Sequence, residues 1–258
     1  MSLFLDTLIK VLCIGGVMLF LLEAGRRIGK HSMNVDPAGA HQGLGPVETA
    51  VFGLMGLIIA LSFSGAALRF DQRRMLIIDE SNAIGTAYLR VDLLPEDSQP
   101  AIRRYFRDYL EGRIELYHNI SNNNKVADLE QKTTALQMKI WKASVLASRQ
   151  SENISANLLL IPALNSMIDI YGTRTAIRQI HQPNIIFIVM ILLAWVCSLI
   201  SGFGMSIRKS RSWIHLIGFV VVLLITIIVI IDLEYPRVGF IRIDSLDVLL
   251  YDLRKMMG

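Results

Sequence analysis

Four long apolar stretches are the feature that most constrains the fold of this chain. They lie near residues 3–22, 47–68, 184–206 and 213–231. A helix needs about 20 residues to cross the hydrocarbon core of a bilayer, which is about 30 Å thick. Hydrophobic residues make up 53% of the chain and are gathered in these blocks rather than spread evenly. The pattern therefore predicts an all-α membrane protein with four transmembrane helices.

A polar segment separates the second apolar stretch from the third, and its pattern predicts helices. One of these helices carries a short heptad seam, formed by Val126, Leu129, Thr133, Leu136, Ile140, Ala143 and Ala147. Such a seam is typical of a bundle within one chain or of a coiled coil between subunits, and both interpretations stay open. The predicted organisation is transmembrane helices one and two at 1–68, a helical extramembrane domain at 69–182, transmembrane helices three and four at 183–231, and a tail at 232–258 that packs on the helical domain.

The second apolar stretch carries a stripe of small residues. Spacings of four, three, four, four and three place on one helical face Thr49, Gly53, Gly56, Ala60, Ser64 and Ala67. Such a stripe permits close packing of helices in a membrane, which is its commoner use. It would also line a narrow passage if several copies surrounded an axis. The stripe by itself leaves both interpretations open.

No proline occurs between Pro46 and Pro95, so one helix is expected from 47 to about 94. At 1.5 Å per residue it would be about 70 Å long, over twice the hydrocarbon thickness. The face of the stripe then continues through Asp71, Arg74, Ile78, Asn82 and Gly85. Of these, Asp71, Arg74 and Asn82 are candidates for charged or polar rings. The second helix is thus expected to serve both the membrane and the helical domain.

The charged residues beyond the stripe also have structural explanations. Three arginines lie where such side chains usually reach lipid phosphate, namely Arg69, Arg73 and Arg74. Asp71 and Arg74 are three residues apart and can pair with each other. Asp79 and Glu80 have no basic residue four positions away, so we expect ion pairs with other helices rather than ion binding. Their candidate partners are Arg113, Arg174 and Arg178.

The sequence contains no motif of an enzyme or of a metal site. It has no nucleophile elbow, no His-Glu-x-x-His pair and no phosphate-binding loop. Its five histidines are scattered, and Cys13 and Cys197 both fall in apolar stretches, so no disulfide framework is expected. The net charge of +4 fits arginines beside anionic lipid better than nucleic-acid binding. We therefore expect no catalytic activity, no cofactor, no metal and no nucleic-acid partner.

Positive charge does not decide which side of the membrane holds the helical domain. The short loops after the first and third stretches carry Arg26, Arg27, Lys30, Arg208, Lys209 and Arg211, which favours an external domain. The larger total of arginines on the domain side favours a cytoplasmic one. Both orientations are consistent with the sequence.

Four segments together resemble the bestrophin-like family of bacterial membrane proteins. They are LSFSGAALRFDQRR, DESNAIGTAYLRVDLLP, IPALNSMIDIYGTR and DLEYPRVGFIRI, which follow one another over nearly the whole chain. The resemblance implies four spans, with the helical domain between spans two and three. More distantly, it implies a pentameric ion channel of the bacterial inner membrane with a cytoplasmic helical domain. The second helix would then line the path of small inorganic ions.

Carried over by position, the apolar neck of a bestrophin falls on Gly53, Gly56, Ala60 and Ser64, with Phe63 beside them. Bestrophin necks use bulky apolar rings, whereas this stripe is small and partly polar. In the fourth segment, Asp232 and Arg237 are expected to brace the tail against the helical domain. The expected function is a homo-oligomeric ion channel surrounded by membrane lipids. The alternative is a non-conducting membrane scaffold or sensor whose helical domain binds a partner.

Overall fold

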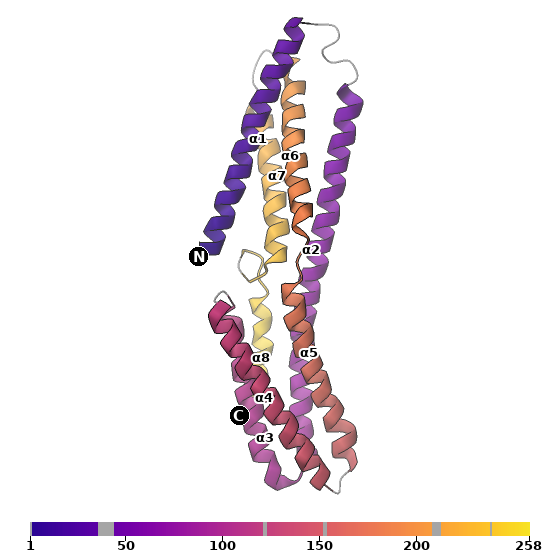
Figure 1. The fold of residues 1–258 in the computed structure, drawn as a ribbon, viewed down its shortest axis with the longest axis vertical. Coiled ribbons are helices and arrows are strands. Elements are labelled where there is room, and N and C mark those ends of the chain that lie inside the picture. Colours follow the sequence, from indigo (N-terminus) through magenta and orange to yellow (C-terminus); the bar gives the residue numbers. More distant parts are fainter. Residues whose placement is uncertain (1, 36–43, 121–122, 152–153, 208–212, 238) are drawn as a thin grey trace. The chain divides into compact units, whose positions relative to one another are not determined.

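The computed structural model describes residues 2–35, 44–120, 123–151, 154–207, 213–237 and 239–258. The regular secondary structure of these residues is helical throughout (Figure 1). The chain divides into two compact units. One comprises Met1–Phe70 and His181–Phe240, and the other comprises Asp71–Ile180 and Ile241–Gly258.

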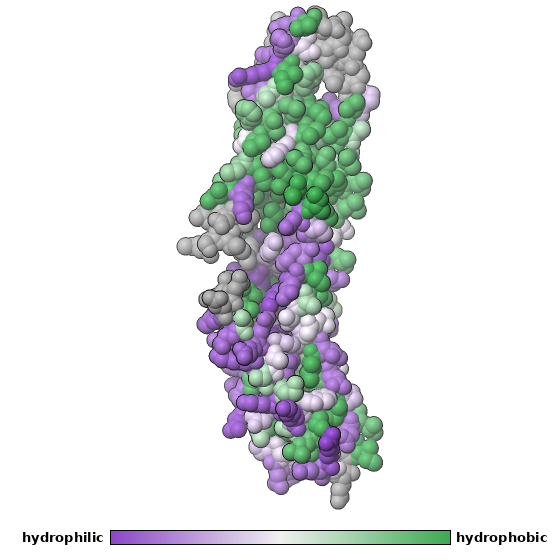
Figure 2. Space-filling view, in the orientation of Figure 1, coloured by the Kyte–Doolittle hydropathy of each residue, from purple (hydrophilic) through white to green (hydrophobic). Residues whose placement is uncertain are grey.

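Four helices are long and apolar enough to cross a membrane, namely α1 (Ser2–Val35), α2 (Leu44–Leu89), α6 (Asn184–Gly204) and α7 (Trp213–Glu234). The mean hydropathy of their candidate spans runs from 2.0 to 3.2. The predicted fold class is therefore confirmed, with a helical domain inserted between the second and third spans. We call the unit that contains α1, α6, α7 and the first part of α2 the membrane unit, and the other the extramembrane unit. Figure 2 shows apolar residues covering most of the visible face of the membrane unit.

In the membrane unit, α1 packs along α6 through small residues. A Cβ atom added to Gly25 would lie 2.0 Å from the carbonyl oxygen of Leu199. One added to Gly202 would lie 2.0 Å from the carbonyl oxygen of Leu22. These distances leave no room for a side chain on either glycine, so the two backbones approach as closely as small residues permit. Among the described residues, α2 approaches no other helix as closely as α1 approaches α6.

The extramembrane unit is a helical bundle. It contains the rest of α2 together with α3 (Gln99–His118), α4 (Asn123–Gln150), α5 (Ile161–Gln179) and α8 (Val248–Met256). Single helical turns in the chain lie at Arg90–Leu93, Glu96–Ser98, Ala156–Leu160, Met205–Ile207 and Asp244–Asp247. α3 packs against α4 and α8. Leu129, Ile140 and Ala147 of the heptad seam on α4 are buried inside this bundle, which favours packing within one chain.

Candidate functional site

The small-residue stripe of α2 is exposed in the single chain. Its exposed members are Thr49, Gly53, Gly56, Ala60 and Ser64, with Phe63 beside them, and Ala67 is half-buried. A Cβ atom added to Gly53 or Gly56 would meet no heavy atom within 4 Å. The opposite face of α2 carries the buried Met55, Ser62 and Ala66. Within the described part of the chain, the stripe is therefore not a packing surface.

Large apolar side chains border the stripe on one side. Leu54, Leu57, Leu61 and Leu68 are all exposed in the single chain. At 100° per residue, these leucines lie about a sixth to a third of a turn from the stripe. The exposed face of α2 thus has a narrow centre of small residues and a flank of leucines. Among the residues that the structure describes, both parts of this face are exposed.

In the extramembrane unit, the candidate polar residues Asp71, Arg74 and Asn82 are also exposed. Asp71 and Arg74 form an ion pair whose N···O distance is 3.3 Å, and both side chains are at least half exposed. An exposed pair of this kind contributes little stability. Gly85 departs from the predicted face, because it is buried and a Cβ atom there would lie 3.2 Å from Leu253 Cδ1.

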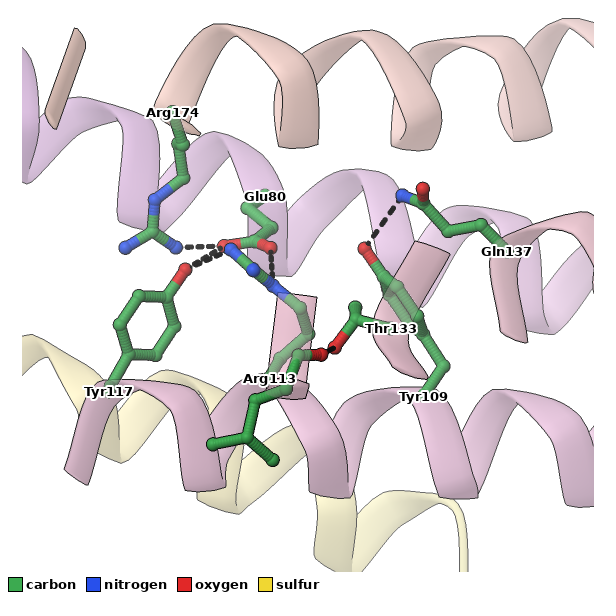
Figure 3. Close-up of polar contacts among 8 residues, drawn as sticks. Glu80, Tyr109, Arg113, Tyr117, Thr133, Gln137 and Arg174 are labelled. Carbon is green, nitrogen blue, oxygen red and sulfur yellow. Dashed lines mark hydrogen bonds and ion pairs between the residues drawn. The ribbon is translucent and has the colours of Figure 1, made fainter. Parts of the chain in front are cut away.

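A buried charge cluster attaches α2 to two other helices of the extramembrane unit (Figure 3). The carboxylate of Glu80 on α2 accepts a hydrogen bond from Arg113 Nε on α3 at 2.6 Å. Its second oxygen pairs with Arg174 on α5 and accepts a hydrogen bond from the Tyr117 hydroxyl at 3.0 Å. Glu80 is fully buried, and Arg113 is 2% exposed. Arg113 and Arg174 are two of the three partners that are predicted for Glu80 from the sequence. The third candidate, Arg178, pairs with Glu130 instead.

Aromatic rings surround the two arginines of this cluster. The Arg113 guanidinium carbon lies 4.6 Å from the ring centre of Tyr171 and 5.0 Å from that of Tyr117. Farther along α3, the Tyr109 hydroxyl accepts a hydrogen bond from Gln137 at 3.1 Å. Burial raises the pKa of the Tyr109 phenol, and the nearby Arg113 charge lowers it in part. The cluster has the burial and the filled hydrogen bonds of a structural anchor.

A second buried network lies at one end of the membrane unit. Arg69 Nε on α2 donates to Glu234 Oε1 at the end of α7, at 2.7 Å. Arg69 Nη2 also donates to Gln182 Oε1 at 3.3 Å, and Gln182 Nε2 donates to the Ser62 hydroxyl at 3.1 Å. Beside them, His181 Nδ1 lies 3.6 Å from Glu234 Oε2. These contacts tie α2 to α7 and to the short segment that precedes α6.

The remaining candidates have simpler surroundings. Arg73 is buried and donates to the carbonyl oxygen of Ile180 at 2.8 Å. Asp79 is exposed, although it directly precedes the buried Glu80. The backbone amide of Phe240 donates to Asp232 Oδ2 at 2.8 Å, and Arg237 is half-buried. That Asp232 and Arg237 brace the tail against the helical domain stays a prediction.

Glu234, Gln182 and His181 are not among the site residues predicted from the sequence. Glu234 offered a usable signal, because it is an acidic residue at the end of the most apolar stretch and three arginines follow the second span. A buried acid next to a span usually has a cationic partner. Gln182 and Ser62 gave no such signal, since their pairing depends on how the helices are placed.

Comparison with known proteins finds a matching family model and solved structures with a similar fold. A family model described as Bestrophin-like domain matches residues 12–246. The crystal structure of a single-substitution variant of a bacterial bestrophin homologue from Klebsiella pneumoniae is 15% identical over 96% of both chains, with a TM-score of 0.71. Another structure of a Klebsiella pneumoniae homologue is 14% identical over 93% of this chain and 97% of that one, with a TM-score of 0.69. A search of curated proteins finds no match.

At sequence identities of 14–15%, the structural similarity shows only that the fold is the same. The match to the family model shows that the sequence itself belongs to the family. This chain has four apolar helices, a helical domain between the second and third of them, and a second helix that runs through both units. The protein is therefore a membrane protein, and its chain belongs to the bestrophin-like family.

Proposed function

We propose that this protein forms a homo-oligomeric ion channel in the bacterial inner membrane, in which α2 of each subunit lines the path of small inorganic ions. The observation that carries the proposal is the exposed small-residue face of α2, where Gly53 and Gly56 have open space beside them. The resemblance to bestrophins implies five subunits and a cytoplasmic position for the extramembrane unit.

The cost of glycine to helix stability is a reason to expect that the small-residue face of α2 has a role in an assembly of several chains. Glycine within a helix costs up to about 1 kcal/mol relative to alanine, so such residues usually serve close approach or open space. In the membrane unit, Gly25 and Gly202 serve close approach between α1 and α6. Gly53 and Gly56 of α2 have no such contact among the described residues. A narrow passage around an oligomer axis would use them.

The flank of the stripe supports assembly of several copies. Leu54, Leu61 and Leu68 recur at intervals of seven residues and are exposed in one chain. In an oligomer with the small residues facing an axis, these leucines would lie toward a neighbouring subunit. Contacts between subunits would then cover the leucines while the stripe remained facing the axis.

Ion flux through liposomes tests the proposal. Gly56→Trp and Ala60→Trp should each abolish flux, because an indole would fill a narrow passage. Val222→Trp on α7 is the matched control, since Val222 is exposed and belongs neither to the stripe nor to its leucine flank. It should assemble and conduct like the native protein.

Two outcomes would reject the assignment of the path. One is unchanged conductance of the stripe variants with normal assembly. The other is a native assembly that passes no ions and buries the stripe between helices of two subunits. The second outcome would support the alternative function, a scaffold or sensor whose helical domain binds a partner.

A further inference from the structure

The carboxylate of Glu234 in the membrane unit is shared between two basic side chains of different character. Its Oε1 atom accepts a hydrogen bond from Arg69 Nε at 2.7 Å. Its Oε2 atom lies 3.6 Å from His181 Nδ1, which is too far for a hydrogen bond. The Glu234 side chain is fully buried, whereas that of His181 is 33% exposed. Solvent protons can therefore reach the histidine without opening the network.

His181 is the group of this network whose charge can change near neutral pH. Imidazole is the side chain that ordinarily gains or loses a proton between about pH 5 and 8, while arginine stays charged. A neutral ring at 3.6 Å interacts weakly with the Glu234 carboxylate. A protonated ring would be drawn to the carboxylate and could donate a charge-assisted hydrogen bond to it.

Charged groups near His181 either oppose or favour its protonation. On α2, the positive charge of Arg69 opposes a second cation, and on α7 the negative charge of Glu234 favours it. The ring also stacks on Tyr235, with 4.7 Å between ring centres and 25° between their planes. Earlier on α7, Asp232 accepts the Phe240 amide. One buried carboxylate is thus positioned to hold two cations at once.

We propose that His181 and Glu234 form a proton-operated latch at this end of the membrane unit. When His181 is protonated, the latch closes and the segment before α6 is tied to α7 by an ion pair. Arg69 shares the same carboxylate and also contacts Gln182, so the closed latch holds the Ser62–Arg69 part of α2 more firmly. When His181 is neutral, the contacts of Arg69 with Glu234 and Gln182 remain. The latch does not depend on ion conduction.

Hydrogen exchange of the purified full-length protein tests the latch. After correction for the intrinsic effect of pH on exchange, amides of residues 62–70 and 231–235 should be about two- to fivefold more protected at pH 6 than at pH 8, as expected for one partly exposed ion pair. His181→Phe keeps an aromatic ring for Tyr235 and removes the titrating group, so it should abolish this difference.

His118→Gln is the control, because His118 contacts Tyr251 in the extramembrane unit and has no part in the network. It should keep the native difference. Glu234→Gln removes the anionic partner and should abolish the difference where the variant folds. A native protein whose protection is equal at both pH values would overturn the latch, as would an unchanged difference in His181→Phe. Since the readout is amide protection, the result stands whether or not the protein passes ions.

Discussion

The membrane unit contains two faces of small residues with similar composition and opposite surroundings. On α1 and α6, a Cβ atom added to Gly25 or Gly202 would lie 2.0 Å from a carbonyl oxygen of the facing helix. On α2, a Cβ atom added to Gly53 or Gly56 would meet no atom of the described residues within 4 Å. The first face is filled by its neighbour within the chain, and the second is left open.

This difference shows that the spacing of small residues in the sequence identifies a small-residue face but does not predict what covers that face. Gly25 and Gly29 lie four residues apart on α1, a spacing that also occurs within the stripe of α2. The sequence analysis predicts a small-residue stripe on α2, for which packing is the commoner interpretation, and predicts none on α1. Close packing inside the chain occurs on α1, at Gly25 and Gly29, and on α6, at Gly202. The attachments of α2 come instead from charged residues along its length.

The largest expected effect tests those charged attachments. Glu80→Ala should lower the free energy of unfolding by about 3–5 kcal/mol, because it leaves Arg113 and Arg174 buried without their anion. Asp79→Ala is the matched control, since the neighbouring acid is exposed, and it should change stability by less than about 0.5 kcal/mol. Chemical denaturation in detergent, followed by circular dichroism, measures both. Equal losses would show that the cluster does not anchor α2.

A smaller effect tests the contrast between the two faces directly. Gly202→Ala should destabilise the protein by about 1–3 kcal/mol, because its methyl group would overlap the Leu22 carbonyl and force α1 from α6. Gly53→Ala should leave stability unchanged or raise it by up to about 1 kcal/mol through helix propensity. The same denaturation curves compare the two variants. If both alanines were tolerated equally, the distinction between filled and open faces would fail.

The smallest effect concerns the exposed polar continuation of α2. Asp71→Asn removes the partner of Arg74 from a pair that is at least half exposed, so stability should fall by less than about 0.5 kcal/mol. The loss should shrink further in high salt, which screens exposed charges. Unfolding measured at low and high ionic strength checks this expectation. A loss above about 1 kcal/mol that is independent of salt would mean that this part of α2 is covered rather than open.

Much of the architecture could be predicted because it depends on local properties of the chain. Four apolar runs of sufficient length predict four spans, and the proline-free interval after Pro46 predicts a single long helix, found as Leu44–Leu89. Glu80 has no basic residue four positions away, which predicts a partner on another helix, with Arg113, Arg174 and Arg178 as the candidates. Two of the three meet it in the structure, on α3 and α5.

What the sequence by itself determined is the membrane class, the inserted helical domain and the continuity of α2, since hydrophobic length and helix-breaking residues act within one segment. Only the tertiary structure decided which small-residue face is filled and which carboxylate meets Arg69. That partner, Glu234, lies 165 positions away along the chain. The physical reason is that contacts between helices depend on their placement and rotation, which side chains from distant segments set together.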